Sequence, residues 1–246
     1  MRLEAGGPRL SGTRPAVLML ARSPFVAGKT RLTAGLDETA ATALRAALLL
    51  DTLDAVLAPG WPIRVHLEPP DHAVRVEALL REDAALAPEA PRVSWHPQAD
   101  GDLGSRMIAA VSGAIAAGHD LALVVGSDIP DLPTAALVAA RDALVGTPRG
   151  TAVALGPVDD GGFYLVAATD GASLAAACAG VRWSQPTVLD DVTVRLTASG
   201  RHVVRVTPWA DVDDRADLAA LVRRAGTGAA RTRRAAHAIR IYNRPW

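Results

Sequence analysis

Short apolar runs alternate along this chain with longer segments of helical periodicity. The runs AVLML (16–20), IRVHLE (63–68), RVSWH (92–96) and LALVVG (121–126) each have the length of a buried strand. Between the first two, leucine and valine recur at intervals of three and four from about Asp37 to Leu57, which indicates a helix. This alternation predicts an α/β fold with a mostly parallel open sheet and helices on both faces.

The second half of the chain interrupts this alternation once. The runs TAVALGP (151–157) and FYLVAA (163–168) are separated only by VDDGG, which predicts an antiparallel insertion at the sheet edge. Two short helical segments, a strand HVVRV (202–206) and a helix beginning in DVDD (211–214) follow. We therefore expect a flexible leader (1–15), a single domain (16–225) and a basic, unpatterned C-terminal tail (226–246).

Charge and cysteine content exclude several classes of protein. The 26 basic and 26 acidic residues give a formal net charge of zero, so binding of nucleic acid by the whole molecule is not expected. The single cysteine, Cys178, excludes an internal disulfide and a cysteine-rich zinc site. No run approaches the ~18 apolar residues of a membrane span, and the start lacks an apolar signal region. We expect a cytoplasmic protein, with a homodimer as one option.

A single carboxylate follows the most apolar of these runs. Asp128 stands in GSDIPDLP, directly after LALVVG. In open α/β sheets ligands bind at the C-terminal ends of the strands, where a carboxylate can hold a divalent metal ion on the phosphates of a nucleotide. The alternative is that Asp128 caps the helix that follows.

The loop after the first strand carries several cations. In ARSPFVAGKTRL, Arg22, Lys29 and Arg31 surround Gly28, a combination suited to a diphosphate or triphosphate. The loop is not a Walker A motif, because Ser23 stands where that motif requires glycine. The alternative is a solvated basic loop.

A second glycine-rich loop follows the third strand. Gln98 offers a donor and an acceptor that suit the edge of a nucleobase, and Gly101 and Gly104 imply a tight backbone. We favour Asp102 as the N-cap of the next helix over a role in binding. Arg106 is a candidate for contact with a phosphate or a nearby carboxylate.

Later segments add weaker candidates. A plain turn uses one Asp-Gly pair, whereas this segment has a second glycine, Gly162, after Asp160 and Gly161. Asp160 is therefore a candidate for contact with sugar or acceptor hydroxyls, or for holding the metal. A hairpin turn is the alternative. Trp183 either stacks on a sugar or base or packs as a lid over the core. For Asp213, helix capping is favoured over a direct site role.

The order of these motifs resembles a known family. ARSPFVAGKTRL, QADGDLGSRM, GSDIPDLP, GPVDDGGFYLV, WS and DVDDRADL follow one another as in the bacterial GT-A-like glycosyltransferases, which include the proposed arsenosugar-biosynthesis glycosyltransferases. More distantly, the chain is similar to the molybdenum-cofactor and phospholactate nucleotidyltransferases. The resemblance covers roughly residues 16 to 222 and implies a nucleotide-diphospho-sugar transferase fold.

The resemblance also implies roles for individual residues. Lys29 and Arg31 would face the donor phosphates, the loop from Gln98 to Gly104 would meet base and ribose, and Asp160-Gly161-Gly162 would line the acceptor side. Asp128 would hold Mg²⁺ or Mn²⁺, although the chain has Asp128 and Asp131 where GT-A enzymes have a DxD motif.

Three functions remain open on these grounds. The favoured one is glycosyl transfer from a nucleotide-diphospho-sugar to a small-molecule acceptor. The second is nucleotidyl transfer from a nucleoside triphosphate, which releases pyrophosphate. The third is a non-catalytic nucleotide-binding module.

Overall fold

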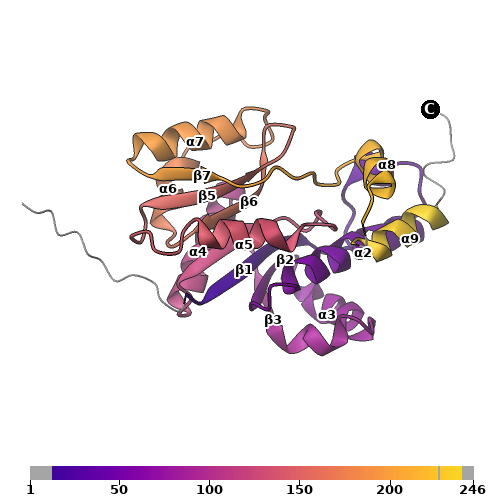
Figure 1. The fold of residues 1–246 in the computed structure, drawn as a ribbon. Helices are drawn as coiled ribbons and strands as arrows, with labels where there is room; N and C mark the ends of the chain where they lie inside the picture. The colour runs from indigo at the N-terminus through magenta and orange to yellow at the C-terminus, as the bar shows by residue number, and fades with distance from the viewer. Residues whose placement is uncertain (1–12, 227, 240–246) are drawn as a thin grey trace, which may run out of the picture. The chain divides into compact units, whose positions relative to one another are not determined.

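A computed structural model describes residues 13–226 and 228–239 of the chain. Its strands form one seven-stranded sheet in the order β3-β2-β1-β4-β6-β5-β7, with helices around it, which confirms the predicted α/β class (Figure 1). The chain divides into two compact units, each made of segments far apart in the sequence. Unit 1 comprises the described residues of 1–18, 99–125 and 135–209, and unit 2 those of 19–98, 126–134 and 210–246.

Unit 2 is built around β2 and β3. These strands are parallel, with Ile63 paired to Val93. The elements are the end of β1 (Pro15–Arg22), α1 (Thr30–Thr33), α2 (Glu38–Leu57), β2 (Ile63–Glu68), η1 (Pro70–His72), α3 (Ala73–Glu82), η2 (Ala87–Arg92), β3 (Val93–Pro97), α8 (Arg215–Arg223) and α9 (Ala230–Ala238).

Helix α2 matches the helix expected from the leucine periodicity. It begins after Asp37, whose side chain accepts a hydrogen bond from the Ala40 backbone N–H at 2.8 Å and so satisfies one of the unpaired amides of the first turn. Leu44 and Leu48 on its inner face are buried in a cluster with Leu218 of α8. Burial of this apolar face contributes most of the helix's stability.

The C-terminal part of unit 2 differs from the expected unpatterned tail. Residues from Ala230 to Ala238 form α9, which packs against α2. Its buried residues, Thr232 and Ala236, are small, so the helix shows no strong apolar periodicity. Arg231 of this helix pairs with Asp51 of α2 and with Asp83, which follows α3. Residues 240–246 of this tail and the leader up to residue 12 lie outside the described residues.

Unit 1 contains the antiparallel part of the sheet. Its elements include α4 (Leu103–Ala116), β4 (Leu121–Val125), α5 (Thr134–Asp142), β5 (Ala152–Pro157), β6 (Phe163–Ala168), α6 (Ala172–Cys178), α7 (Val188–Ala198) and β7 (His202–Arg205). Strand β6 runs antiparallel to both β4 and β5, and β7 pairs in parallel with β5. The antiparallel pairing predicted for the strands around VDDGG is confirmed, with β7 adjoining this pair.

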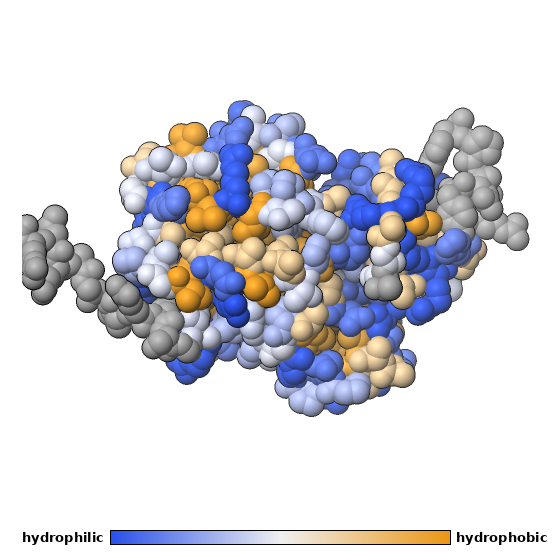
Figure 2. All heavy atoms as spheres, in the orientation of Figure 1, coloured by the Kyte–Doolittle hydropathy of each residue, from blue (hydrophilic) through white to orange (hydrophobic). Residues whose placement is uncertain are grey.

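Several large apolar side chains are exposed at the surface. On the face seen in Figure 2, apolar and hydrophilic residues are interspersed. Large exposed apolar residues within the described ranges are Val74, Leu103, Val145 and Val194. None of the helices in these ranges is both long enough and apolar enough to cross a bilayer.

Candidate functional site

The loop after β4 holds Asp128 in a fixed position within unit 2. The backbone N–H of the next residue, Ile129, donates to the buried Thr52 hydroxyl of α2 at 3.1 Å. The carbonyl of Asp128 accepts a hydrogen bond from the N–H of Val212 at 2.9 Å. Val212 is itself buried, so the loop and the segment before α8 are joined at a core residue.

Three carboxylates meet at this point. One oxygen each of Asp128, Asp211 and Asp213 lies within 4.8 Å of the others. Asp213 does not cap α8, because Asp214 is the N-cap and accepts from the backbone N–H groups of residues 216 and 217. The Asp213 carboxylate therefore remains available to side chains of other elements.

Lys29 lies among these carboxylates. Its Nζ donates to Asp128 Oδ2 at 2.8 Å, to Asp213 Oδ1 at 2.8 Å and to the Val212 carbonyl at 2.9 Å. Burial of the ammonium lowers the pKa of Lys29, but the attraction of Asp128 and Asp213 and their hydrogen bonds outweigh it, so that the pKa lies above its ordinary value. The Lys29 side chain is therefore charged near neutral pH.

The backbone at Lys29 is unusual. Lys29 has a left-handed conformation (φ 49°) where it begins α1, a region that costs energy for a residue with a side chain. Leu32, three residues on, is fully buried and anchors α1 in the core. Arg31 is 71% exposed and reaches the second oxygen of Asp213, with 3.2 Å between Nη2 and Oδ2. Lys29 and Arg31, both predicted as phosphate contacts, thus converge on the acidic cluster.

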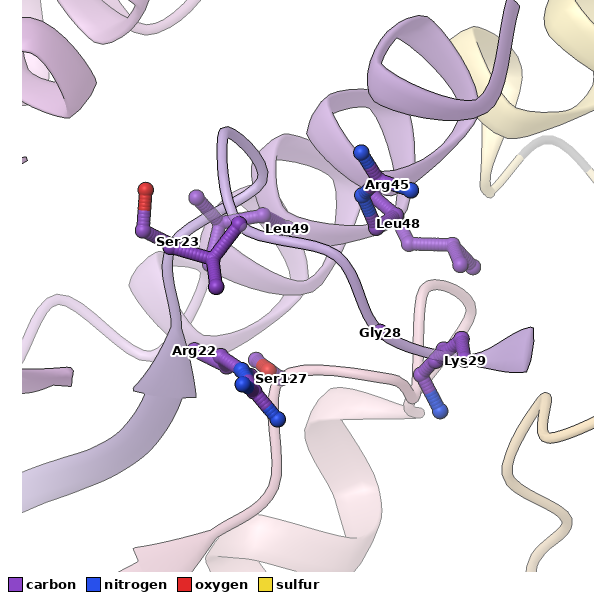
Figure 3. A pocket seen from close by; sticks show the side chains of 9 residues that line it. Arg22, Ser23, Gly28, Lys29, Arg45, Leu48, Leu49 and Ser127 are labelled. Carbon is purple, nitrogen blue, oxygen red and sulfur yellow. The ribbon is translucent and has the colours of Figure 1, made fainter. Parts of the chain in front are cut away.

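The rest of the first loop encloses a small pocket. The buried guanidinium of Arg45 donates to the Pro24 carbonyl at 2.9 Å, and the N–H of Ser23 donates to Glu68 O at 2.8 Å, so the start of the loop is held. A cavity of about 60 Å³ lies beside this loop (Figure 3). The lining residues are Arg22, Ser23, Val26, Gly28, Lys29, Arg45, Leu48, Leu49 and Ser127.

Gln98 also lies in unit 2. Its Nε2 donates to the carbonyl of Ala21 in β1 at 2.8 Å. The side chain therefore supports the end of β1, where the first loop begins. Its predicted contact with a nucleobase stays a prediction.

In unit 1, Asp102 caps α4 as the sequence predicted. Its Oδ1 accepts from the N–H of Ser105 at 2.8 Å, and its Oδ2 accepts from the indole N–H of Trp183 at 3.0 Å. Hydrogen bonds from the Ser105 backbone, the Ser105 hydroxyl and Trp183 hold the pKa of Asp102 below its ordinary value. The ring of Trp183 also meets Phe163 edge to face.

Glycines of the same loop make room for neighbouring side chains. A Cβ on Gly104 would come within 2.7 Å of Trp183 and 2.8 Å of Cys178, so only glycine fits beneath the indole. Gly101 has φ 102°, and its carbonyl accepts from Arg106 Nε at 3.1 Å. The tight backbone expected for this loop is thus used for packing within unit 1.

The VDDGG turn shows a similar use of glycine. Asp160 Oδ1 accepts from the N–H of Gly162 at 2.9 Å, which closes a local turn, and the Asp160 side chain is exposed. At Gly161, with φ 88°, a Cβ would lie 1.9 Å from the Pro186 carbonyl oxygen. At Gly161 the backbone of Pro186 therefore occupies the space that a side chain would need.

We expect Gly161→Ala to destabilise unit 1 strongly. The new methyl group would collide with backbone atoms of Pro186, and the left-handed φ disfavours alanine, so the free energy of unfolding should fall by about 2–4 kcal/mol. Urea denaturation followed by circular dichroism measures it. Gly162→Ala is the matched control, because its nearest contact is a side-chain oxygen at 3.2 Å. An equal loss in the two variants would contradict the steric explanation.

Asp211 is the member of the acidic cluster that sequence analysis did not single out. Asp211 and Asp213 are two positions apart and precede a capped helix. In extended backbone, alternate side chains point to the same side. The spacing of Asp211 and Asp213 could have indicated a shared metal site, but helix capping explains acidic residues before a helix equally well.

A family model covers most of the segment that carries these loops. It matches residues 50–185, more than half of the chain, and describes an "uncharacterized protein conserved in bacteria". The chain belongs to this family, DUF2064. The matched residues include Asp128 and the loops of unit 1 that carry Asp102 and Asp160. Lys29, Arg31 and Asp213 of this DUF2064 protein lie outside them.

The solved structures similar to the DUF2064 chain include three that carry the name of a transferase or a synthase. A proposed nucleotide-diphospho-sugar transferase from Desulfovibrio desulfuricans G20 has 25% identity and a TM-score of 0.68 over 86% of this chain and 87% of its own. The 4-diphosphocytidyl-2C-methyl-D-erythritol synthase of Anaerococcus prevotii DSM 20548 has 12% identity and a TM-score of 0.54, covering 87% and 100%. A nucleotidyl transfer enzyme from Methanothermobacter thermautotrophicus has 18% identity and a TM-score of 0.52, covering 85% and 96%.

These likenesses establish the fold. The two structures below 25% identity share the architecture alone, and the first adds sequence similarity over most of both chains. The DUF2064 chain therefore has the fold of the nucleotide-diphospho-sugar and nucleotidyl transferases, as its motif order implied. None of the curated proteins matches the sequence.

Proposed function

We propose that this protein is a metal-dependent transferase that uses a nucleotide-activated donor, and that it transfers a glycosyl group from a nucleotide-diphospho-sugar to a small-molecule acceptor in the cytoplasm. The observation that carries the proposal is the cluster of Asp128, Asp211 and Asp213 with Lys29, located after the C-terminal end of β4. Ligand sites of open α/β sheets lie at this end of the strands.

The carboxylates suit a hard divalent cation. Mg²⁺ and Mn²⁺ prefer oxygen ligands, and the cluster offers three carboxylate oxygens within 4.8 Å of one another. Asp128, Asp211 and Asp213 would hold the ion. When bound, such an ion neutralises charge on the diphosphate of the donor and of the leaving group.

The cations nearby would bind the donor phosphates. Lys29 and Arg31 already contact the acidic cluster, and Arg22 lines the pocket beside Lys29. Their positive charges would stabilise the negative charge that grows on the departing nucleoside diphosphate. Gly28 would let the loop backbone approach a phosphate oxygen closely.

Two further groups of site residues keep the roles that the family resemblance implies. Gln98 and the loop with Gly101, Asp102 and Gly104 would contact base and ribose, and Asp160, Gly161 and Gly162 would line the acceptor side. Arg106 would contact a phosphate, and Trp183 would stack on a sugar or base. For Gly104 and Gly161, packing within unit 1 is an additional reason for the glycine.

Nucleotidyl transfer from a nucleoside triphosphate is the second candidate. It would use the same metal ion and cations, and two structures of similar fold are a nucleotidyl and a cytidylyl transferase. The loop from Ser23 to Lys29 contains one glycine, Gly28, and so offers few unhindered amides for a triphosphate. This observation favours a diphosphate donor.

A thermal-shift panel tests the proposal. Nucleoside diphosphates, triphosphates and nucleotide sugars are each added with and without Mn²⁺, because a ligand of the folded state raises Tm by mass action. A metal-dependent shift with a diphosphate or nucleotide sugar is expected and would identify the base. A rise in Tm confined to triphosphates would favour nucleotidyl transfer. A rise in Tm that does not depend on Mn²⁺ would favour a non-catalytic binding module.

A further inference from the structure

This inference rests on the proposed function and concerns the same acidic cluster. Lys29 neutralises the carboxylates that a metal ion would need. The three N–H groups of its ammonium are matched by three oxygens, those of Asp128, Asp213 and the Val212 carbonyl, all within 2.9 Å. Two of its partners, Asp128 and Asp213, belong to the set of three carboxylates. Lys29 therefore acts as the cluster's internal cation.

An ammonium and a divalent ion cannot share these carboxylates at no cost. Both would lie within a few ångströms of the same oxygens, and their mutual repulsion is strong at a partly buried site. The side chains of Lys29 and Asp128 are 23% and 25% exposed, so solvent screens this repulsion only in part. A metal ion on the cluster would therefore displace the ammonium of Lys29.

The displaced ammonium of Lys29 can reach the pocket beside the first loop. Lys29 already lines this cavity together with Arg22 and Ser127 (Figure 3). Lysine carries its charge on a flexible stem, so the ammonium can move without a shift of the α1 backbone. The third cation of the pocket, Arg45, is committed to the Pro24 carbonyl and to Glu38.

The lining of the pocket, whose volume is about 60 Å³, suits a phosphate group. Arg22 supplies a positive charge and Ser127 a hydroxyl donor, which together match the oxygens of a phosphate. Once released from the carboxylates, Lys29 would supply a second positive charge to the same phosphate.

We propose that Lys29 is a resident cation that exchanges with the divalent metal ion, and that its released ammonium binds one phosphate group of the donor in the pocket beside Arg22 and Ser127. Metal binding and phosphate binding are then coupled through one side chain. Because such coupling is reciprocal, the phosphate also raises the affinity for the metal.

The first experiment measures Mn²⁺ binding alone, by isothermal titration calorimetry and by the EPR signal of free Mn²⁺, with the full chain and no nucleotide. Lys29→Met removes the competing charge, so it should bind Mn²⁺ at least about tenfold more tightly than the wild type. Arg31→Met is the matched control. Its guanidinium is 71% exposed and lies 3.2 Å from one carboxylate oxygen, so its effect should be less than about threefold.

The outcomes separate the inference from the proposed function. Equal or weaker Mn²⁺ affinity in Lys29→Met, with Mn²⁺ still bound by the wild type, would overturn the exchange and leave the metal site standing. Binding in neither protein would overturn the metal site and the exchange with it. Binding of Mn²⁺ by Lys29→Met and not by the wild type would support the exchange, because Lys29 would then exclude the metal ion completely when no nucleotide is present.

A second experiment tests the pocket with pyrophosphate in metal-free buffer. Asp213→Asn removes one of the two negative charges that hold Lys29, so the affinity for pyrophosphate should rise about fivefold. The double variant Lys29→Met/Asp213→Asn should lose this gain, because Lys29 is then absent. A gain that persists in the double variant would show a general effect of charge and would overturn the role of Lys29.

Discussion

Replacing Asp128 by asparagine should lower the metal-dependent transfer activity by about 10²- to 10³-fold, since a bound metal ion contributes several kcal/mol of transition-state stabilisation. The fold should remain, because Asp128 is partly exposed and its loop is held through backbone groups, namely the Ile129 N–H and the Asp128 carbonyl. An asparagine can still accept a hydrogen bond from Lys29 but is a weaker ligand for Mg²⁺ or Mn²⁺.

The measurement is the initial rate with the donor that the thermal-shift panel identifies, across a range of Mn²⁺ concentrations. Asp214→Asn is the matched control. Asp214 neighbours Asp213 and caps α8 without joining the acidic cluster, and asparagine caps helices as well as aspartate does. Full activity in Asp128→Asn, or an equal loss in Asp214→Asn, would contradict the assignment of the metal site.

Replacing Arg231 by methionine should lower the free energy of unfolding by about 3 kcal/mol, because it leaves a buried carboxylate without its ionic partner. Asp51 of α2 is 1% exposed, and Arg231 Nη1 lies 2.8 Å from its Oδ1. The same guanidinium reaches Asp83 at 2.6 Å and Asp54 at 3.0 Å. These pairs join α9 to α2 and to the end of α3.

Urea denaturation measures the loss. Arg234→Met is the matched control, because Arg234 lies in the same helix with an exposed side chain, and its effect should stay within about 0.5 kcal/mol. A loss below about 1 kcal/mol in Arg231→Met would show that α9 is held mainly by apolar contacts such as Ala236.

The pH dependence of the free energy of unfolding gives an independent check of the pair formed by Arg231 and Asp83. The pKa of Asp83 is lowered to about 2, and hydrogen bonds from Arg231 are the largest cause. A lowered carboxyl pKa contributes stability that is present above pH ~4 and lost as the pH falls toward 2. Arg231→Met should therefore lose less stability than the wild type between pH 4 and 2. Parallel curves for the two proteins would contradict this linkage.

Some of the candidate site could be read from local sequence. A buried apolar run followed by Gly126 and Asp128 sets a carboxylate at a strand end, because burial and chain direction fix where the strand stops. Capping of α4 by Asp102 was predictable for the same kind of reason, since the cap and the amide it accepts from are three residues apart.

Other parts of the site depend on contacts between distant residues. Lys29 lies 99 positions from Asp128 and 184 from Asp213, so no periodicity or local motif indicates that they meet. The close approach of Pro186 to Gly161 is of the same kind. Helix α9 also escaped prediction, because its small buried residues give little apolar signal and its ion pairs join it to Asp51 and Asp83.

The sequence by itself determined the α/β class, most elements and the strand end that carries Asp128, since apolar periodicity, caps and turns act over a few residues. Only the tertiary structure decided that Asp211 and Asp213 join Asp128 and that Lys29 lies among them. These pairings arise when packing of the core brings remote segments together, and burial then makes the charges depend on one another.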